Sequence, residues 1–298
     1  EELLSKYSTT IRFFHACGSI PQLDLRLRGW LAVLRFDSNS ESVADRLEDV
    51  TEAAQVVVAS ESLREMLRFV LSIGNVLNDS SRNLRNAKGF RLKELQKLSS
   101  LMKAGYQPGG AGMDAAQSSL LAFVATTIHE HEASIKTAKK TTGSTDGDSS
   151  AAPSALFSEV FLEEMAIVED ACRVDLAVLA TDLKELRGHV NMCNDFVKRA
   201  EKLAEKKKKE NLEAEKNGDD DVAISTFHDF SKRSSEEVTA LEEEFETMNS
   251  ALQAMSLYLG EGGNAAASEE GPTELLSHIA QFSIELQRVK TAAAVAAK

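Results

Sequence analysis

Two long runs of apolar residues, spaced alternately by three and four positions, constrain this 298-residue chain more than any other feature. The first run extends from Cys172 to Val197 and the second from Val238 to Leu259. Such spacing places one apolar seam along an α-helix and drives two such helices to pack at a shallow angle. A polar reversal at 216–221 separates the two runs. The chain is therefore predicted to contain two long helices that pair antiparallel within one molecule.

The composition favours helices elsewhere in the chain as well. Strong helix formers (Leu, Ala, Glu and Lys) are abundant, whereas Pro and aromatic residues are few. Periodic apolar positions predict further helices at 3–17, 19–36, 43–58, from Ser60 to about Gly74, at 117–138 and from Pro272 onward. The apolar residues after Ser60 surround the helix, which predicts burial on most sides.

Three segments are predicted to lie outside helices. Asp37 to Ser42 is polar and is expected to form a turn between two of the helices. Residues 105–112 are rich in Gly and are expected to form a surface loop. Residues 141–154 have almost no apolar content, which is typical of a disordered insertion.

Composition and motifs also exclude several functional classes. Cys17, Cys172 and Cys193 show no CxxC spacing, so a zinc site or disulfide framework is not expected and a reducing cytosol fits best. No apolar run reaches the roughly 18 residues that span a bilayer, and a net charge of −13 argues against nucleic acid as a partner. The six His residues lack partners at ligand or catalytic spacing, and no phosphate-binding Gly motif occurs. We therefore expect no enzyme activity, metal or cofactor.

The most distinctive segment runs from Gly74 to Leu98. An apolar helix leads into Gly74-Asn75, a polar loop follows, and Gly89-Phe90 opens a second amphipathic helix. Gly near a helix end is commonly a C-cap, and the ordinary interpretation is that the residues after Gly74 form a loop. The alternative is that Gly74 lets another backbone approach closely.

Residues 82–103 carry seven basic side chains and one acidic one, Glu94, within a strongly acidic chain. A solvated basic face is the ordinary interpretation of such a run. The alternative is a face that binds an acidic partner, since a basic patch raises association rates with it. Lys206–Lys209 form another basic run, which is explained by the dipole at a helix C-terminus. The first cluster comprises Arg82, Arg85, Lys88, Arg91, Lys93, Lys97 and Lys103.

The Gly74–Leu98 segment resembles the signature of the formin homology 2 (FH2) domain, which nucleates actin filaments and stays on their growing ends. Ten positions agree with that signature: Gly74, Asn75, Asn78, Gly89, Phe90, Arg91, Leu92, Leu95, Lys97 and Leu98. Residues 20–27, 60–75 and 257–262 also resemble FH2 segments, so the likeness covers nearly the whole chain.

The resemblance implies an all-α fold, an elongated coiled-coil rod with a globular helical post. By this likeness, 1–18 is the end of a knob, 19–59 the first coiled-coil helices, 60–162 the post, 163–260 the returning coiled-coil helices and 272–298 a C-terminal helix. A complete FH2 domain also has a lasso, a linker and a full knob before these residues. We expect those parts, and the proline-rich segment that binds profilin, to be absent here.

Function also follows from the resemblance. FH2 domains dimerise because the lasso of one subunit encircles the post of the other, and this implies docking at Gly74, Asn75, Asn78, Gly89, Phe90 and Leu92. The basic cluster is implied to bind actin, with Lys103 as the nearest counterpart of a Lys that is important for activity. We expect the full-length protein to work in the cytoplasm, at the actin cytoskeleton. Residues 1–298 alone are expected to nucleate weakly or not at all.

The sequence departs from the FH2 pattern in the loop. Val76 stands where the family has an aromatic residue, the loop after Asn78 is about one residue longer, and the Gly-rich 105–112 replaces a short turn. These departures keep a second interpretation open, a helical coiled-coil scaffold that binds other proteins without assembling actin.

Overall fold

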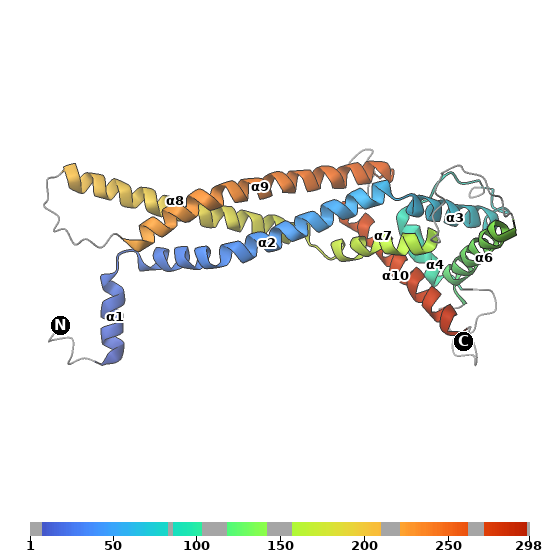
Figure 1. Cartoon of the computed structure of the whole chain (residues 1–298), viewed down its shortest axis with the longest axis horizontal. Coiled ribbons are helices and arrows are strands. Elements are labelled where there is room, and N and C mark those ends of the chain that lie inside the picture. The colour runs from blue at the N-terminus through green and yellow to red at the C-terminus, as the bar shows by residue number, and fades with distance from the viewer. Residues whose placement is uncertain are drawn as a thin grey trace. The chain divides into compact units, whose positions relative to one another are not determined.

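The computed structural model describes residues 8–82, 86–102, 118–141, 157–209, 221–261 and 271–296. Within these ranges the chain forms nine α-helices and one 3₁₀ helix and no strand, which confirms the predicted all-α fold class (Figure 1). The helices are α1 (Thr9–Ser19), α2 (Leu23–Ala59), α3 (Glu61–Leu77), η2 (Leu92–Gln96), α4 (Lys97–Ser100), α6 (Leu120–Thr141), α7 (Phe157–Ala171), α8 (Leu176–Lys209), α9 (Val222–Tyr258) and α10 (Pro272–Ala296). None of the described helices has the length and apolar character needed to cross a membrane.

The chain divides into two compact units. The first comprises residues 1–47 and 175–246, and the second comprises residues 48–174 and 247–298. Helices α2 and α9 each contribute residues to both units. The assignment of residue ranges to a knob, a coiled coil and a post stays a prediction.

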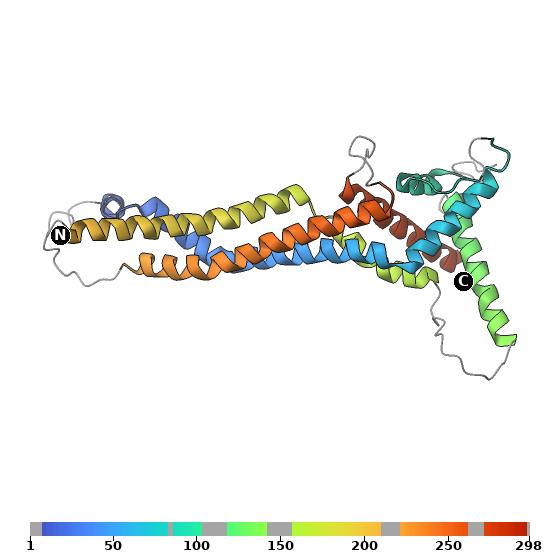
Figure 2. The same ribbon diagram turned by 90° about the horizontal axis from the view of Figure 1, so that it is seen from above.

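The first unit packs α8 against α9 and α2. Helices α8 and α9 run antiparallel, as predicted (Figure 2). Arg187 of α8 donates to Glu242 of α9 at 2.6 Å. The rings of Phe196, nearer the C-terminus of α8, and Phe227, nearer the N-terminus of α9, lie 5.4 Å apart. The seam positions of α8 from Leu179 onward are buried. Cys172, by contrast, precedes the start of this helix.

Helix α2 is continuous, so the turn predicted at 37–42 is wrong. Its polar residues are engaged within the first unit instead of breaking the helix. Ser40 Oγ donates to the Asp37 carbonyl at 3.1 Å and to Glu237 of α9 at 2.6 Å. Arg233 of α9 donates to the Asp37 carboxylate at 3.0 Å. Tertiary contacts thus override local sequence preference, because α9 supplies partners for the polar residues of the expected turn.

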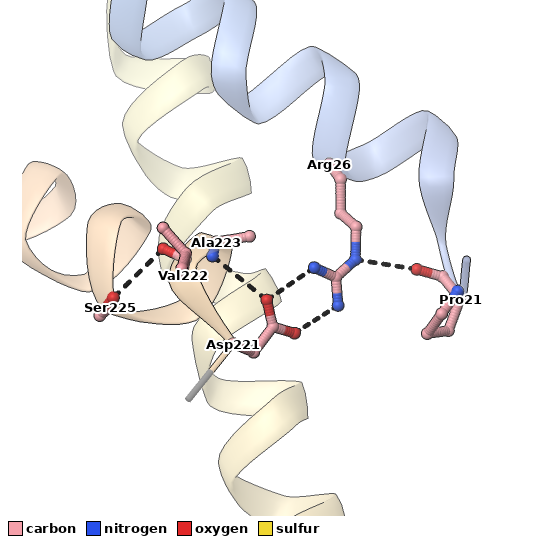
Figure 3. Close-up of polar contacts among 6 residues, drawn as sticks. All are labelled: Pro21, Arg26, Asp221, Val222, Ala223 and Ser225. Atoms are coloured by element: carbon pink, nitrogen blue, oxygen red, sulfur yellow. Dashed lines mark hydrogen bonds and ion pairs between the residues drawn. The ribbon is translucent and has the colours of Figure 1, made fainter. Parts of the chain in front are cut away.

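Arg26 joins the start of α2 to the start of α9 (Figure 3). Its guanidinium binds both carboxylate oxygens of Asp221, one at 2.7 Å, and donates to the Pro21 carbonyl at 3.0 Å. It also lies over the Phe196 ring of α8, 5.4 Å from the centroid. Asp221 caps α9 by accepting the Ala223 N–H at 3.1 Å. The paired guanidinium lowers the pKa of Asp221.

The second unit packs α10 against α7, η2 and α6, and α3 against α7. Its core includes the rings of Phe161 and Phe282, which lie 5.9 Å apart. The helix predicted at 117–138 is confirmed as α6, and the predicted start of the last helix at Pro272 is confirmed as α10. The helix expected after Phe90 is shorter than predicted, because a single 3₁₀ segment and the four-residue α4 occupy this stretch. The insertion predicted at 141–154 and the loop at 105–112 lie outside the described residues, except for Thr141.

Candidate partner-docking site

Helix α3 buries one face and leaves apolar side chains on the other. Ser60 caps the helix by accepting the Leu63 N–H at 2.9 Å, and the buried residues are Ser62, Leu63, Met66 and Val70. Val76 and Leu77, near its C-terminal end, are 73% and 56% exposed. The prediction that this helix is buried on most sides is therefore wrong. Much of the remaining apolar surface of α3 lines two grooves of the second unit.

Asn75 holds the loop that follows α3. Its Nδ2 donates to the Ala87 carbonyl at 3.0 Å, and the Ala87 N–H donates to its Oδ1 at 2.7 Å. One amide thus satisfies both main-chain groups of a residue twelve positions later. Asn86, immediately before Ala87, has a φ of 59°, a left-handed conformation that Asn tolerates better than most residues. The clamp fixes the position at which the chain enters Gly89-Phe90.

The larger groove has a volume of about 670 Å³. Its walls come from the last turns of α3, from the segment between Ala87 and Arg91, and from η2, α4 and the start of α6. Leu71, Leu77 and Phe90 are among its apolar lining residues. A concave apolar surface with a few polar groups is typical of a binding site.

The smaller groove has a volume of about 310 Å³ and shares Leu71, Gly89 and Phe90 with the larger one. Its other residues come from the first turns of α3, from Lys88 and Leu92 on either side of the shared segment, and from the end of α9 and the residue after it. Arg64 lies there, donating to the Tyr258 hydroxyl at 3.1 Å with its guanidinium 5.9 Å from the ring centroid. Phe90 therefore lies where the two grooves meet.

Comparison with known proteins identifies the family. The Formin Homology 2 Domain family model matches residues 1–287. This chain belongs to the FH2 domain family. FH2 domains are non-enzymatic actin-binding domains, which confirms the prediction that the chain is not an enzyme. Membership in the formin family also implies a role in actin assembly, and dimerisation.

Several formins are similar to part of the chain. Formin-like protein 6 of Oryza sativa subsp. japonica is 33% identical over 88 residues, 30% of this chain and 6% of that protein. Formin-like protein 3 of Homo sapiens is 27% identical over 95 residues, 32% of this chain and 9% of that protein. Protein BNI1 of Saccharomyces cerevisiae is 30% identical over 73 residues, 24% of this chain and 4% of that protein. The chain thus matches less than a tenth of the length of each of these relatives.

The two motif glycines of this FH2 domain are not required by its own packing. Beyond the chain neighbours and the backbone of its own helix, a Cβ atom at Gly74 or at Gly89 would meet no heavy atom of the described residues within 4 Å, and neither residue has a positive φ. The C-cap of α3 is Asn78, whose N–H donates to the Gly74 carbonyl at 3.0 Å. The C-cap interpretation of Gly74 is therefore wrong. Both glycines line the larger groove, where a missing Cβ leaves room for another chain.

The remaining residues predicted for docking differ in exposure. Asn78 lines the larger groove together with Gly74, Asn75, Gly89 and Phe90. Leu92 is only 5% exposed, although it borders the smaller groove. It can therefore support the wall of that groove but offers little surface to a partner.

The basic cluster of the FH2 domain does not lie wholly apart from the grooves. Arg91 and Lys97 line the larger groove, where Lys97 pairs with Glu94 at 2.6 Å, and Lys88 lines the smaller one. Arg82 is exposed and borders neither groove, and Lys93 is half-buried. Arg85 and Lys103 lie outside the described residues.

Sequence patterns missed several residues of the grooves. Leu120 and Val124 of α6 line the larger groove, and Tyr258 of α9 lines the smaller one. Leu120 and Val124 fall within the helix predicted at 117–138, but nothing in the sequence pattern placed them beside Phe90. Among the described residues, no group of His, Cys, Asp and Glu side chains could hold a metal ion.

Proposed function

We propose that in the full-length protein this domain nucleates actin filaments and remains on growing barbed ends as a homodimer. Its mechanism is templating, in which actin subunits are held in filament-like geometry without covalent chemistry. The observation that carries the proposal is the pair of apolar grooves around Phe90, lined by the motif residues and by Arg91, Lys97 and Lys88. We propose that the grooves receive a segment of the second subunit, and that the basic cluster contacts the acidic surface of actin in the cytoplasmic cytoskeleton.

Arg82 offers the cleanest test of the actin contact, because it borders neither groove. We expect Arg82→Glu in the full-length protein to slow association with barbed ends, with the largest effect at low salt, since steering between opposite charges is screened by ions. The matched control is Lys232→Glu, an equal charge change at an exposed position of α9. Filament assembly with labelled actin and single-filament imaging would measure both variants, and light scattering would confirm that each remains dimeric.

Reversing the charges of Arg91 and Lys97 tests the groove and the basic cluster together, because both residues belong to the cluster and line the larger groove. We expect Arg91→Glu with Lys97→Glu to reduce barbed-end activity strongly. Unchanged actin assembly in this variant and in Arg82→Glu would contradict the proposal. That result would favour a helical scaffold that binds other proteins without assembling actin.

A further inference from the structure

The segment between the two grooves has unpaired main-chain groups. Within the described residues, the N–H and C=O groups of Lys88, Gly89 and Phe90 make no hydrogen bond. Lys88 and Gly89 are exposed and Phe90 is half-buried. Three successive residues thus have main-chain donors and acceptors without a partner among the described residues, which is the property that lets an exposed strand edge pair with another chain.

Both ends of this short segment are fixed. Before it, the Asn75 amide holds both main-chain groups of Ala87. After it, the Arg91 carbonyl accepts the Glu94 N–H at 2.9 Å, and η2 is anchored by Leu92, which is buried. The unpaired groups are therefore held in place before a partner arrives, which reduces the entropy lost on binding.

The surroundings of the segment suit an extended chain. Gly89 has no side chain, and among the described residues nothing within 4 Å would contact a Cβ there, which leaves room for a second backbone. Both grooves include Gly89 and Phe90, so each of them borders this segment. Successive side chains of an extended segment point to opposite sides, so neighbouring residues of one strand could enter different grooves.

We infer that a segment of the second subunit binds in extended conformation and pairs its main chain with Lys88–Phe90, placing alternate side chains in the two grooves. This inference rests on the proposed docking of a second subunit and specifies how that docking is achieved. In a paired strand, the N–H and C=O of one residue face the same edge, and those of the next residue face the opposite edge. The pairing should therefore engage either Lys88 and Phe90 together or Gly89 alone.

Hydrogen exchange on the full-length protein tests the pairing. Exchange would be followed by mass spectrometry with residue-level fragmentation, at concentrations above and below the dimer dissociation constant. We expect dimerisation to slow exchange about tenfold or more at alternate amides of the segment. Equal exchange of all three amides in monomer and dimer, in a dimer whose groove residues are covered in side-chain footprinting, would overturn the main-chain pairing and leave the docking proposal intact.

Two variants at Phe90 separate the inference from the docking itself. Phe90→Ala keeps the N–H and removes the ring that both grooves share, so it should weaken the dimer however the partner binds. Replacing Phe90 with phenyllactic acid keeps the ring and removes the N–H. If Lys88 and Phe90 form the paired edge, this ester should weaken the dimer about fivefold, as expected for one net main-chain hydrogen bond.

The outcomes of these measurements are distinct. An ester with wild-type affinity, together with no protection at Gly89, would refute main-chain pairing. A dimer unaffected by Phe90→Ala and uncovered at the grooves would refute the proposed docking and the inference with it. Circular dichroism and thermal unfolding of the free variants would show whether any loss arises from misfolding.

Discussion

Replacing Gly74 by Ala should make the free protein more stable and its dimer weaker. Gly74 lies within α3, its φ is not positive, and outside its own helix a Cβ there would meet no heavy atom of the described residues within 4 Å. Ala in a helix is favoured over Gly by about 0.5–1 kcal/mol, and nothing in this subunit opposes that gain. If another chain packs against Gly74, the added methyl group intrudes on that contact. Overpacking of a fitted contact costs about 1–3 kcal/mol, or about 5- to 150-fold in dimer affinity.

Gly188→Ala is the matched control for this prediction. Gly188 lies within α8, and a Cβ there also meets nothing within 4 Å, but the residue is not part of either groove. Both substitutions should raise the free energy of unfolding of the free subunit. Urea denaturation at protein concentrations below the dimer dissociation constant would measure it. Only Gly74→Ala should raise the dimer dissociation constant, measured by analytical ultracentrifugation. Equal dimer affinities for the two variants would refute the interpretation of Gly74 as a point of close approach.

Substitutions at three further positions test particular contacts. Asp221→Ala should destabilise the protein by about 2 kcal/mol through loss of the α9 cap and the ion pair, whereas Asp221→Asn should cost less than half of that because it keeps the cap. Because Arg26 lowers the pKa of Asp221, this pair stabilises the fold fully above the carboxyl's unfolded pKa of about 3.9 and loses its effect as pH falls through the lower folded value. Acid unfolding of Asp221→Asn should therefore be less steep than that of the wild type. Gly29→Ala should destabilise the protein by about 1–3 kcal/mol in thermal unfolding, because its Cβ would lie 2.4 Å from the Phe227 ring, and an unchanged melting temperature would contradict this close packing. Asn75→Ala should weaken the dimer with little change in helix content by circular dichroism, and wild-type affinity would show that the Ala87 clamp is dispensable.

Much of the helical architecture could be predicted because its signals are local. The seams of α8 and α9 repeat over many turns, so their antiparallel pairing followed from spacing and from the polar reversal between them. The start of α3 was also visible, since Ser60 stands three residues before Leu63 and caps the helix through that N–H. The turn expected at 37–42 failed for the opposite reason. Its polar residues form hydrogen bonds with α9, about two hundred positions away. The local sequence at 37–42 gives no information about such distant partners.

The candidate site shows the same division between local and distant information. The motif glycines could be found from the sequence, but their role could not, because a C-cap and a point of close approach use the same residue type. The structure excludes the C-cap at Gly74, since Asn78 is the cap, and the close approach of another chain stays a prediction. The grooves could not be predicted, because Phe90 is joined there by Leu120 of α6 and Tyr258 of α9. The proposed docking of a second chain accounts for a Gly in the wall of an apolar groove where the described residues of its own subunit leave room for a Cβ.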